Sequence, residues 1–123
     1  MSNIRRHQDL KAWQAAIALV KHVYSLTAGF PKDELYGLTS QMRRAAVSVP
    51  SNIAEGAGRG GTREFIQFLG VARGSLSELE TQVHIARELG YVDVTSDLEA
   101  KIEEIFWMIG GLITSLKAKG NAD

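Results

Sequence analysis

Apolar residues recur at intervals of three and four positions along most of this chain, and polar residues fill the positions between them. Such a period places the apolar side chains along one face of an α-helix. The chain shows no run of strand-like alternation and holds only two prolines, so the pattern predicts an all-α fold. Four helices are expected, at about residues 9–28, 33–55, 62–89 and 96–119.

The segments between the predicted helices are short, so successive helices must run antiparallel. In the last two helices the apolar positions alternate by four and three, a spacing typical of helices that pack nearly parallel to each other. The sequence therefore predicts one domain, residues 1–123, folded as an up-down-up-down antiparallel four-helix bundle. In the first helix, the residues expected to face the core are Leu10, Trp13, Ile17, Val20 and Tyr24.

Local signals indicate where the helices begin, end and bend. Asp9 is placed to cap the first helix, because its carboxylate can accept free backbone amide hydrogens, and Gly29 to end it in the left-handed conformation. Pro50 lies well inside the second helix, where its ring removes one backbone hydrogen bond and collides with the carbonyl four residues earlier. We expect a kink there, with Ser51 or Asn52 helping to supply a donor for the freed carbonyl.

Polar residues also form stripes along the second and third predicted helices. Their spacing leaves two interpretations, a hydrogen-bonded network between helices or subunits and a pocket for a ligand. Polar groups at helix seams fix the register at some cost in stability, and this favours the structural network. The residues expected in that network are Arg44, Ser48, Asn52, Glu55, Ser75 and Glu78.

The last helix carries more apolar surface than a single bundle can bury. Residues 105–113, IFWMIGGLI, are apolar around the whole circumference, whereas a bundle helix needs one apolar stripe. Two glycines within a helix cost about 1 kcal/mol each relative to alanine, and they persist where another backbone comes close. We expect Phe106, Trp107, Gly110 and Ile113 to contact another copy of the chain; the alternative is that Trp107 lies flat on its own bundle.

Composition and charge limit the classes of function. The chain has no cysteine, which excludes disulfides, thiolate metal sites and thiol catalysis. It has no apolar run near the roughly 20 residues that span a bilayer and no signal-peptide pattern, so a cytoplasmic protein with no membrane partner is expected. Net charge is zero, but residues 1–74 carry ten basic and five acidic residues, whereas residues 75–123 carry four basic and nine acidic. These charges either cancel between antiparallel helices or leave a basic face for polyanions.

Four arginines are the candidate contacts to nucleic acid. The planar guanidinium group can make two parallel hydrogen bonds to a phosphate, and such contacts give salt-dependent affinity without sequence preference. The alternative is that an arginine in this region pairs with a carboxylate; for Arg44, a pair with Glu55 or Glu78 is favoured. The candidate nucleic-acid-binding residues are Arg43, Arg59, Arg63 and Arg73.

Other motifs carry weaker signals. The glycine-rich segment 56–61 follows a predicted helix rather than a strand, so a plain helix-breaking turn is favoured over a phosphate or dinucleotide site. Glu80 and His84 are one residue too far apart for the Glu-x-x-His pair of di-iron bundles. No nucleophile with a positioned base is evident. We therefore expect no catalytic residues, no metal site and no cofactor.

Several short motifs together resemble a known family. The most specific is the run Arg43-Arg44-Ala45-Ala46 followed by Asn52-Ile53-Ala54-Glu55-Gly56. Others are Trp13-Gln14, Phe30-Pro31, Tyr36-Gly37-Leu38, Gly74-Ser75-Leu76 and Gly90-Tyr91. In these elements, over about residues 9–117, the chain resembles the 23S rRNA-intervening-sequence protein family, also called the four-helix bundle protein family.

The resemblance implies a four-helix bundle that assembles into a ring-like homopentamer and has no established catalytic activity. A similar accessory protein of diversity-generating retroelements is a basic pentameric barrel that works with nucleic acid and a reverse transcriptase, whereas this chain has no net charge. The first hypothesis is a non-enzymatic, oligomeric accessory protein that associates with RNA. The alternatives are an interaction scaffold without nucleic-acid binding and a small-molecule or nucleotide site at residues 56–62.

Overall fold

The computed structural model describes residues 7–122, and every regular element in that range is helical. Strands are absent from this range, which confirms the predicted all-α class. The four long helices are α1 (Lys11–Thr27), α2 (Leu38–Gly58), α3 (Thr62–Glu88) and α4 (Ser96–Ala122). Two short 3₁₀ turns, η1 (His7–Asp9) and η2 (Lys32–Glu34), precede α1 and α2.

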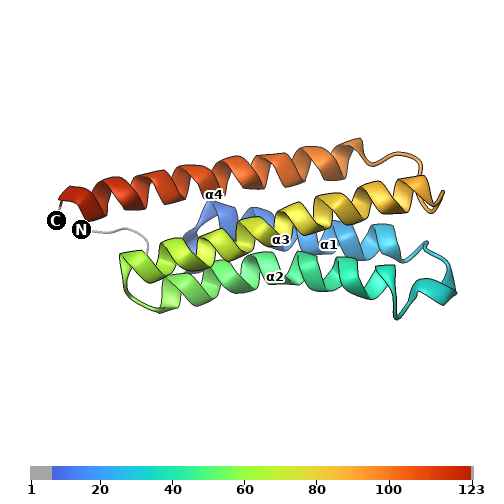
Figure 1. Ribbon diagram of the computed structural model, residues 1–123, viewed down its shortest axis with the longest axis horizontal. Helices are drawn as coiled ribbons and strands as arrows, with labels where there is room; N and C mark the ends of the chain where they lie inside the picture. Colours follow the sequence, from blue (N-terminus) through green and yellow to red (C-terminus); the bar gives the residue numbers. More distant parts are fainter. Residues whose placement is uncertain (1–6, 123) are drawn as a thin grey trace.

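The four helices lie side by side and alternate in direction, as Figure 1 shows. Each helix packs against the next one in the chain, and α4 packs against α1 to close the bundle. The contact between α2 and α3 is the most extensive of these. Within the described range no Cα atom of α1 lies within 8 Å of one in α3, and none of α2 lies within 8 Å of one in α4, so the members of each pair lie on diagonals of the bundle.

The core lies between the four apolar stripes. Along α2, α3 and α4 most of the regularly spaced apolar residues are buried, because a period near 3.6 keeps them on one side of each helix. The largest fully buried side chains are Leu19 and Val23 of α1, Met42, Val49 and Ile53 of α2, Leu69, Leu76 and Leu79 of α3, and Leu98, Ile102, Ile105 and Ile109 of α4.

The core face of α1 differs from the one expected. Ile17 and Tyr24 are nearly half exposed, and Trp13 and Val20 are only partly buried. The helix carries apolar residues on two adjacent faces, one position apart in sequence, and periodicity alone cannot choose between them. Packing buries the face with the smaller side chains, and its residues are Ala12, Ala16, Leu19, Val23 and Thr27.

The helix ends also correct three local expectations. Asp9 belongs to the 3₁₀ turn η1, and α1 begins after Leu10 without a side-chain cap. The helix ends at Thr27 rather than at Gly29 in a left-handed conformation; positive φ angles occur instead at Gly60 and Gly90. Helix α2 begins five residues later than expected, because residues 32–34 form η2.

Helix α2 continues through Pro50 and ends at Gly58, three residues beyond the expected end. The Asn52 side chain does donate to a backbone carbonyl, but the acceptor is Ser48, at 2.8 Å, and not the carbonyl that Pro50 leaves free. At the far end of the helix, a β-carbon on Gly56 would come within 2.8 Å of the Phe68 side chain. This glycine therefore lets the end of α2 lie close against the start of α3.

Candidate functional site

Part of the predicted polar network joins α2 to α3. The hydroxyls of Ser48 and Ser75 share a hydrogen bond of 2.8 Å. The Asn52 amide donates to the Ser48 hydroxyl at 2.9 Å, and the Ser75 hydroxyl also lies 3.3 Å from the Val71 carbonyl. These bonds set Ser48 opposite Ser75, so they fix how the two helices are aligned along their length.

The other three residues expected in the network lie outside it. Glu55 forms an exposed ion pair with Arg59 one turn later, at 3.1 Å. Arg44 and Glu78 are exposed, and within residues 7–122 neither forms an ion pair or a side-chain hydrogen bond. The pair of Arg44 with Glu55 or Glu78 favoured by the sequence is therefore not present in this conformation.

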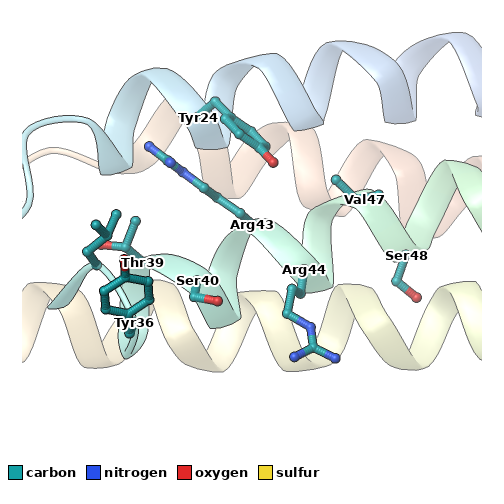
Figure 2. A pocket seen from close by; sticks show the side chains of 9 residues that line it. Tyr24, Tyr36, Thr39, Ser40, Arg43, Arg44, Val47 and Ser48 are labelled. Atoms are coloured by element: carbon teal, nitrogen blue, oxygen red, sulfur yellow. The ribbon is translucent and has the colours of Figure 1, made fainter.

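An open groove of about 610 Å³ runs along the outer face of α2, beside the end of α1. Figure 2 shows the two consecutive arginines diverging across it, Arg43 toward α1 and Arg44 toward α3. The Tyr36 ring stands at one end, and Thr39 and Ser40 lie between it and the arginines. We call the residues Tyr36, Thr39, Arg43, Arg44 and Val47 the α2 surface.

Arg43 is held in place by α1. Its Nε donates to the Thr27 hydroxyl at 2.9 Å, and its guanidinium carbon lies 4.5 Å from the centre of the Tyr24 ring. Thr27 in turn donates to the Val23 carbonyl at 2.7 Å. The Arg43 side chain is therefore held against α1 at the edge of the groove. The Arg44 side chain beside it is exposed.

Two features of the α2 surface lack partners within the described chain. Tyr36 is 93% exposed, although tyrosine carries a large apolar ring. The Thr39 side chain is only 3% exposed, and its hydroxyl oxygen makes no hydrogen bond. A buried hydroxyl without a partner is unfavourable by about 1–3 kcal/mol. The sequence signal for this groove was the apolar pair Leu35-Tyr36 in a polar connection.

A second unpartnered surface lies on α4. Trp107 is 76% exposed, and the adjoining groove of about 510 Å³ is lined by Arg73 of α3 and by Phe106, Gly110 and Gly111. A β-carbon built on either glycine would meet nothing within 4 Å, so packing within the chain does not require glycine there. We call the residues Arg73, Glu103, Glu104, Trp107, Gly110 and Gly111 the α4 surface.

Ile113 corrects one expectation about this surface. It is only 7% exposed and belongs to the core of its own bundle, so no second surface is needed to cover it. Phe106 and Gly110 are half-buried. The alternative in which Trp107 lies flat on its own bundle does not hold in this structure, given how exposed the residue is.

The four candidate nucleic-acid contacts do not form one patch. Arg59 and Arg63 lie near the turn between α2 and α3, and the Arg59 guanidinium also lies 5.2 Å from the centre of the Phe68 ring. Arg43 lies on the α2 surface and Arg73 on the α4 surface, on opposite sides of the bundle. The four arginines of one chain therefore do not form one continuous binding surface.

Charge is instead divided between the two ends of the bundle. The end near residues 59–62 holds a cleft of about 570 Å³ that His7, Thr62 and Lys119 line. Around this end stand the basic residues Lys11, Arg59, Arg63, Lys117 and Lys119 and the acidic residues Asp9, Glu55 and Glu64. The opposite end is acidic, with Asp33, Glu34, Glu88, Asp93, Asp97 and Glu99 against Lys32, Arg43, Arg87 and Lys101.

Two carboxylates at the acidic end have lowered pKa values. The Leu38 amide and the Tyr91 hydroxyl donate to Glu34, at 3.0 and 2.8 Å, and they lower its pKa because they favour the charged form. The hydrogen bond from Thr95 and the nearby Arg87 guanidinium likewise lower the pKa of Glu99. Through these bonds Glu34 connects the start of α2 to Tyr91, and Glu99 connects α4 to Arg87 of α3.

The described residues contain no group of three or more histidines, cysteines or acidic residues placed to hold a metal ion. In the same part of the chain, no helix has the length and apolar character needed to cross a bilayer.

Comparison with protein families gives a match over most of the chain. The family model for the 23S rRNA-intervening sequence protein matches residues 8–111. This span contains all of α1, α2 and α3 and most of α4, including Trp107 and both glycines of the α4 surface. No curated protein matches the chain.

Proposed function

Because the chain belongs to the 23S rRNA-intervening sequence protein family, we propose that it is a non-enzymatic four-helix bundle that acts as a homo-oligomer, in a ring-like assembly for which the resemblance implies five copies. The observation that carries this proposal is Trp107, which is 76% exposed beside two glycines that packing within the chain does not require. Tryptophan is among the residues that contribute most to protein–protein interfaces.

The energies favour association at this surface. A tryptophan buries about 150–250 Å² in an interface, so covering the exposed part of the indole is worth about 3–5 kcal/mol at about 25 cal/mol per Å². Two helix-interior glycines cost about 1 kcal/mol each relative to alanine, and nothing within the chain offsets that cost. A partner that covers Trp107 and approaches the bare backbone would offset both.

The test is the native mass of the purified protein across dilution. We expect an oligomer for the wild type and smaller species for Trp107→Ala. Val94→Ala is the matched control, because Val94 is also 76% exposed and lies in the connection before α4. A wild-type chain that stays monomeric from micromolar to millimolar concentration would refute the proposal.

The role proposed for the assembly is that of an RNA-associated accessory protein. The observation that favours RNA is the grouping of Arg59, Arg63, Lys117 and Lys119 at one end of the bundle. In a ring with the copies aligned, these groups would gather on one rim, where phosphates bind without sequence preference. Arg43 and Arg73 lie elsewhere on the bundle, and this proposal leaves them out.

Arg59→Ala with Arg63→Ala should weaken retention of single-stranded RNA. Affinity for nucleic acid falls as salt rises, and each lost phosphate contact makes the slope of log affinity against log salt shallower by about 0.7. The slope of the double variant should therefore be shallower than that of the wild type by about 1.4. The matched control is Lys21→Ala with Lys32→Ala, which removes the same charge from exposed positions elsewhere.

Equal retention by the double variant and the wild type would discard the two arginines as contacts. If the wild type retains no RNA at about 0.15 M salt, where exposed charges are screened beyond about 8 Å, the alternative of a scaffold without nucleic-acid binding takes its place.

A further inference from the structure

The α2 surface and the α4 surface lie on opposite sides of the same bundle. Helices α2 and α4 lie on a diagonal of the bundle, and their outer faces point away from each other across the core. Both surfaces lack partners within the chain, and they differ in shape. One is a groove between α1 and α2, and the other is a single projecting indole beside bare backbone.

The two surfaces are complementary in shape. The groove of about 610 Å³ has Tyr36 at one end and the arginines along its side, and an indole fits between such walls because arginine stacks on aromatic faces.

The charges around the two surfaces also match. Glu103 and Glu104 lie one turn before Trp107; both are exposed and, within residues 7–122, neither takes part in an ion pair. Arg43 and Arg44 flank the groove, and Arg44 is exposed without a carboxylate partner in the same range. The α4 surface also carries Arg73. Two glutamates and one arginine on the α4 surface would therefore face the two arginines of the α2 surface.

We propose that the occupant of the α2 groove is a second copy of this chain, with its Trp107 inserted in the groove and its Glu103 and Glu104 beside Arg44. Each copy then contacts one neighbour through its α4 surface and another through its α2 surface. Such a head-to-tail interface closes into a ring if the rotation between copies allows it and extends as a chain if it does not. This inference rests on the proposed self-association and names the residues that produce it.

The first test uses charge reversal. Arg44→Glu alone, and Glu103→Arg with Glu104→Arg, should each raise the dissociation constant between subunits at least tenfold, because like charges then face each other across the interface. Combining the three substitutions in one chain should restore assembly. Lys21→Glu is the control, since it reverses a charge on the exposed side of α1. Circular dichroism confirms that each variant keeps its helical content.

The second test mixes two defective chains. Trp107→Ala keeps an intact groove, and Arg44→Glu keeps an intact indole, so each chain retains one working surface. A head-to-tail interface predicts that each is monomeric alone and that an equal mixture forms a dimer with one copy of each. Native mass spectrometry distinguishes that dimer from either chain alone by the mass difference of the substitutions.

The outcomes separate this inference from the proposal on which it rests. If Trp107→Ala is monomeric while Arg44→Glu keeps the wild-type mass, self-association through α4 stands, and its pairing with the α2 groove is overturned. The pairing of the two surfaces is also overturned if the chain with all three charge reversals fails to assemble and the mixture gives no mixed dimer. A monomeric wild type overturns both.

Discussion

Alanine at both glycines of the α4 surface should change folding stability and assembly in opposite directions. Gly110 and Gly111 lie within α4, and a β-carbon at either position would meet no other atom within 4 Å in the same chain. Alanine is therefore accommodated in the isolated bundle. In the proposed assembly, the two added methyl groups would stand between α4 and the neighbouring copy.

The magnitude follows from helix propensity. Each glycine costs about 1 kcal/mol relative to alanine within a helix, so Gly110→Ala with Gly111→Ala should stabilise the isolated bundle by about 2 kcal/mol. For a chain of 123 residues the unfolding entropy is about 0.26 kcal/mol/K, and the gain corresponds to a rise in melting temperature of about 8 °C. The same two methyl groups should weaken assembly, because they keep the facing backbone or side chains from close approach.

The assay separates the two effects. Urea unfolding is measured in a Trp107→Ala background, where the chain is expected to be monomeric, and assembly is measured in the wild-type background by sedimentation. Gly74→Ala is the matched control, because Gly74 is an exposed glycine within α3 whose added β-carbon would also meet nothing within 4 Å. The control should stabilise the chain by about 1 kcal/mol and leave assembly unchanged.

Two results would refute this reasoning. A loss of stability in the monomeric background would mean that α4 packs against its own bundle more closely than the structure shows. Unchanged assembly with the expected gain in stability would mean that the glycines of α4 face solvent in the oligomer, and the α4 surface would not be an interface.

Three further predictions concern the fold. Ser48→Ala and Ser75→Ala should each destabilise the bundle by about 1 kcal/mol in urea unfolding, and the double variant should lose less than the sum, because the substitutions share one hydrogen bond; strict additivity would show that this bond contributes nothing. Thr39→Val should stabilise the monomer by about 1–3 kcal/mol, because it removes a buried hydroxyl without a partner; a loss would point to a hydrogen bond absent from this conformation. The lowered pKa of Glu34 contributes stability that is fully present above the ordinary value of 4.5 and is lost as pH falls through the lowered value. In Tyr91→Phe the free energy of unfolding should therefore fall less between about pH 6 and pH 3 than in the wild type. A pH profile identical to that of the wild type would contradict this prediction.

The apolar period was sufficient to identify four helices and most of their core positions, since an α-helix is built from local hydrogen bonds and repeats every 3.6 residues. It also placed Ser48, Asn52 and Ser75 on facing polar stripes, where the structure joins them by hydrogen bonds. The same period could not decide which of two adjacent apolar faces of α1 turns inward. That choice depends on how closely neighbouring helices approach, and it places alanines in the core and leaves Ile17 and Tyr24 partly outside.

The candidate surfaces depend on contacts between helices. Arg43 bonds to Thr27, a residue 16 positions away on another helix, and no local pattern distinguishes it from the exposed Arg44 that follows it. The groove lined by Tyr36 and Thr39 likewise exists only because α1 and α2 meet there. Sequence alone determined the helices and the apolar surplus near Trp107, because these follow from neighbours along the chain. Tertiary structure decided that Ile113 lies in the core, that the arginines are dispersed and that the two unpartnered surfaces face opposite ways, because burial and direction depend on the packing of all four helices.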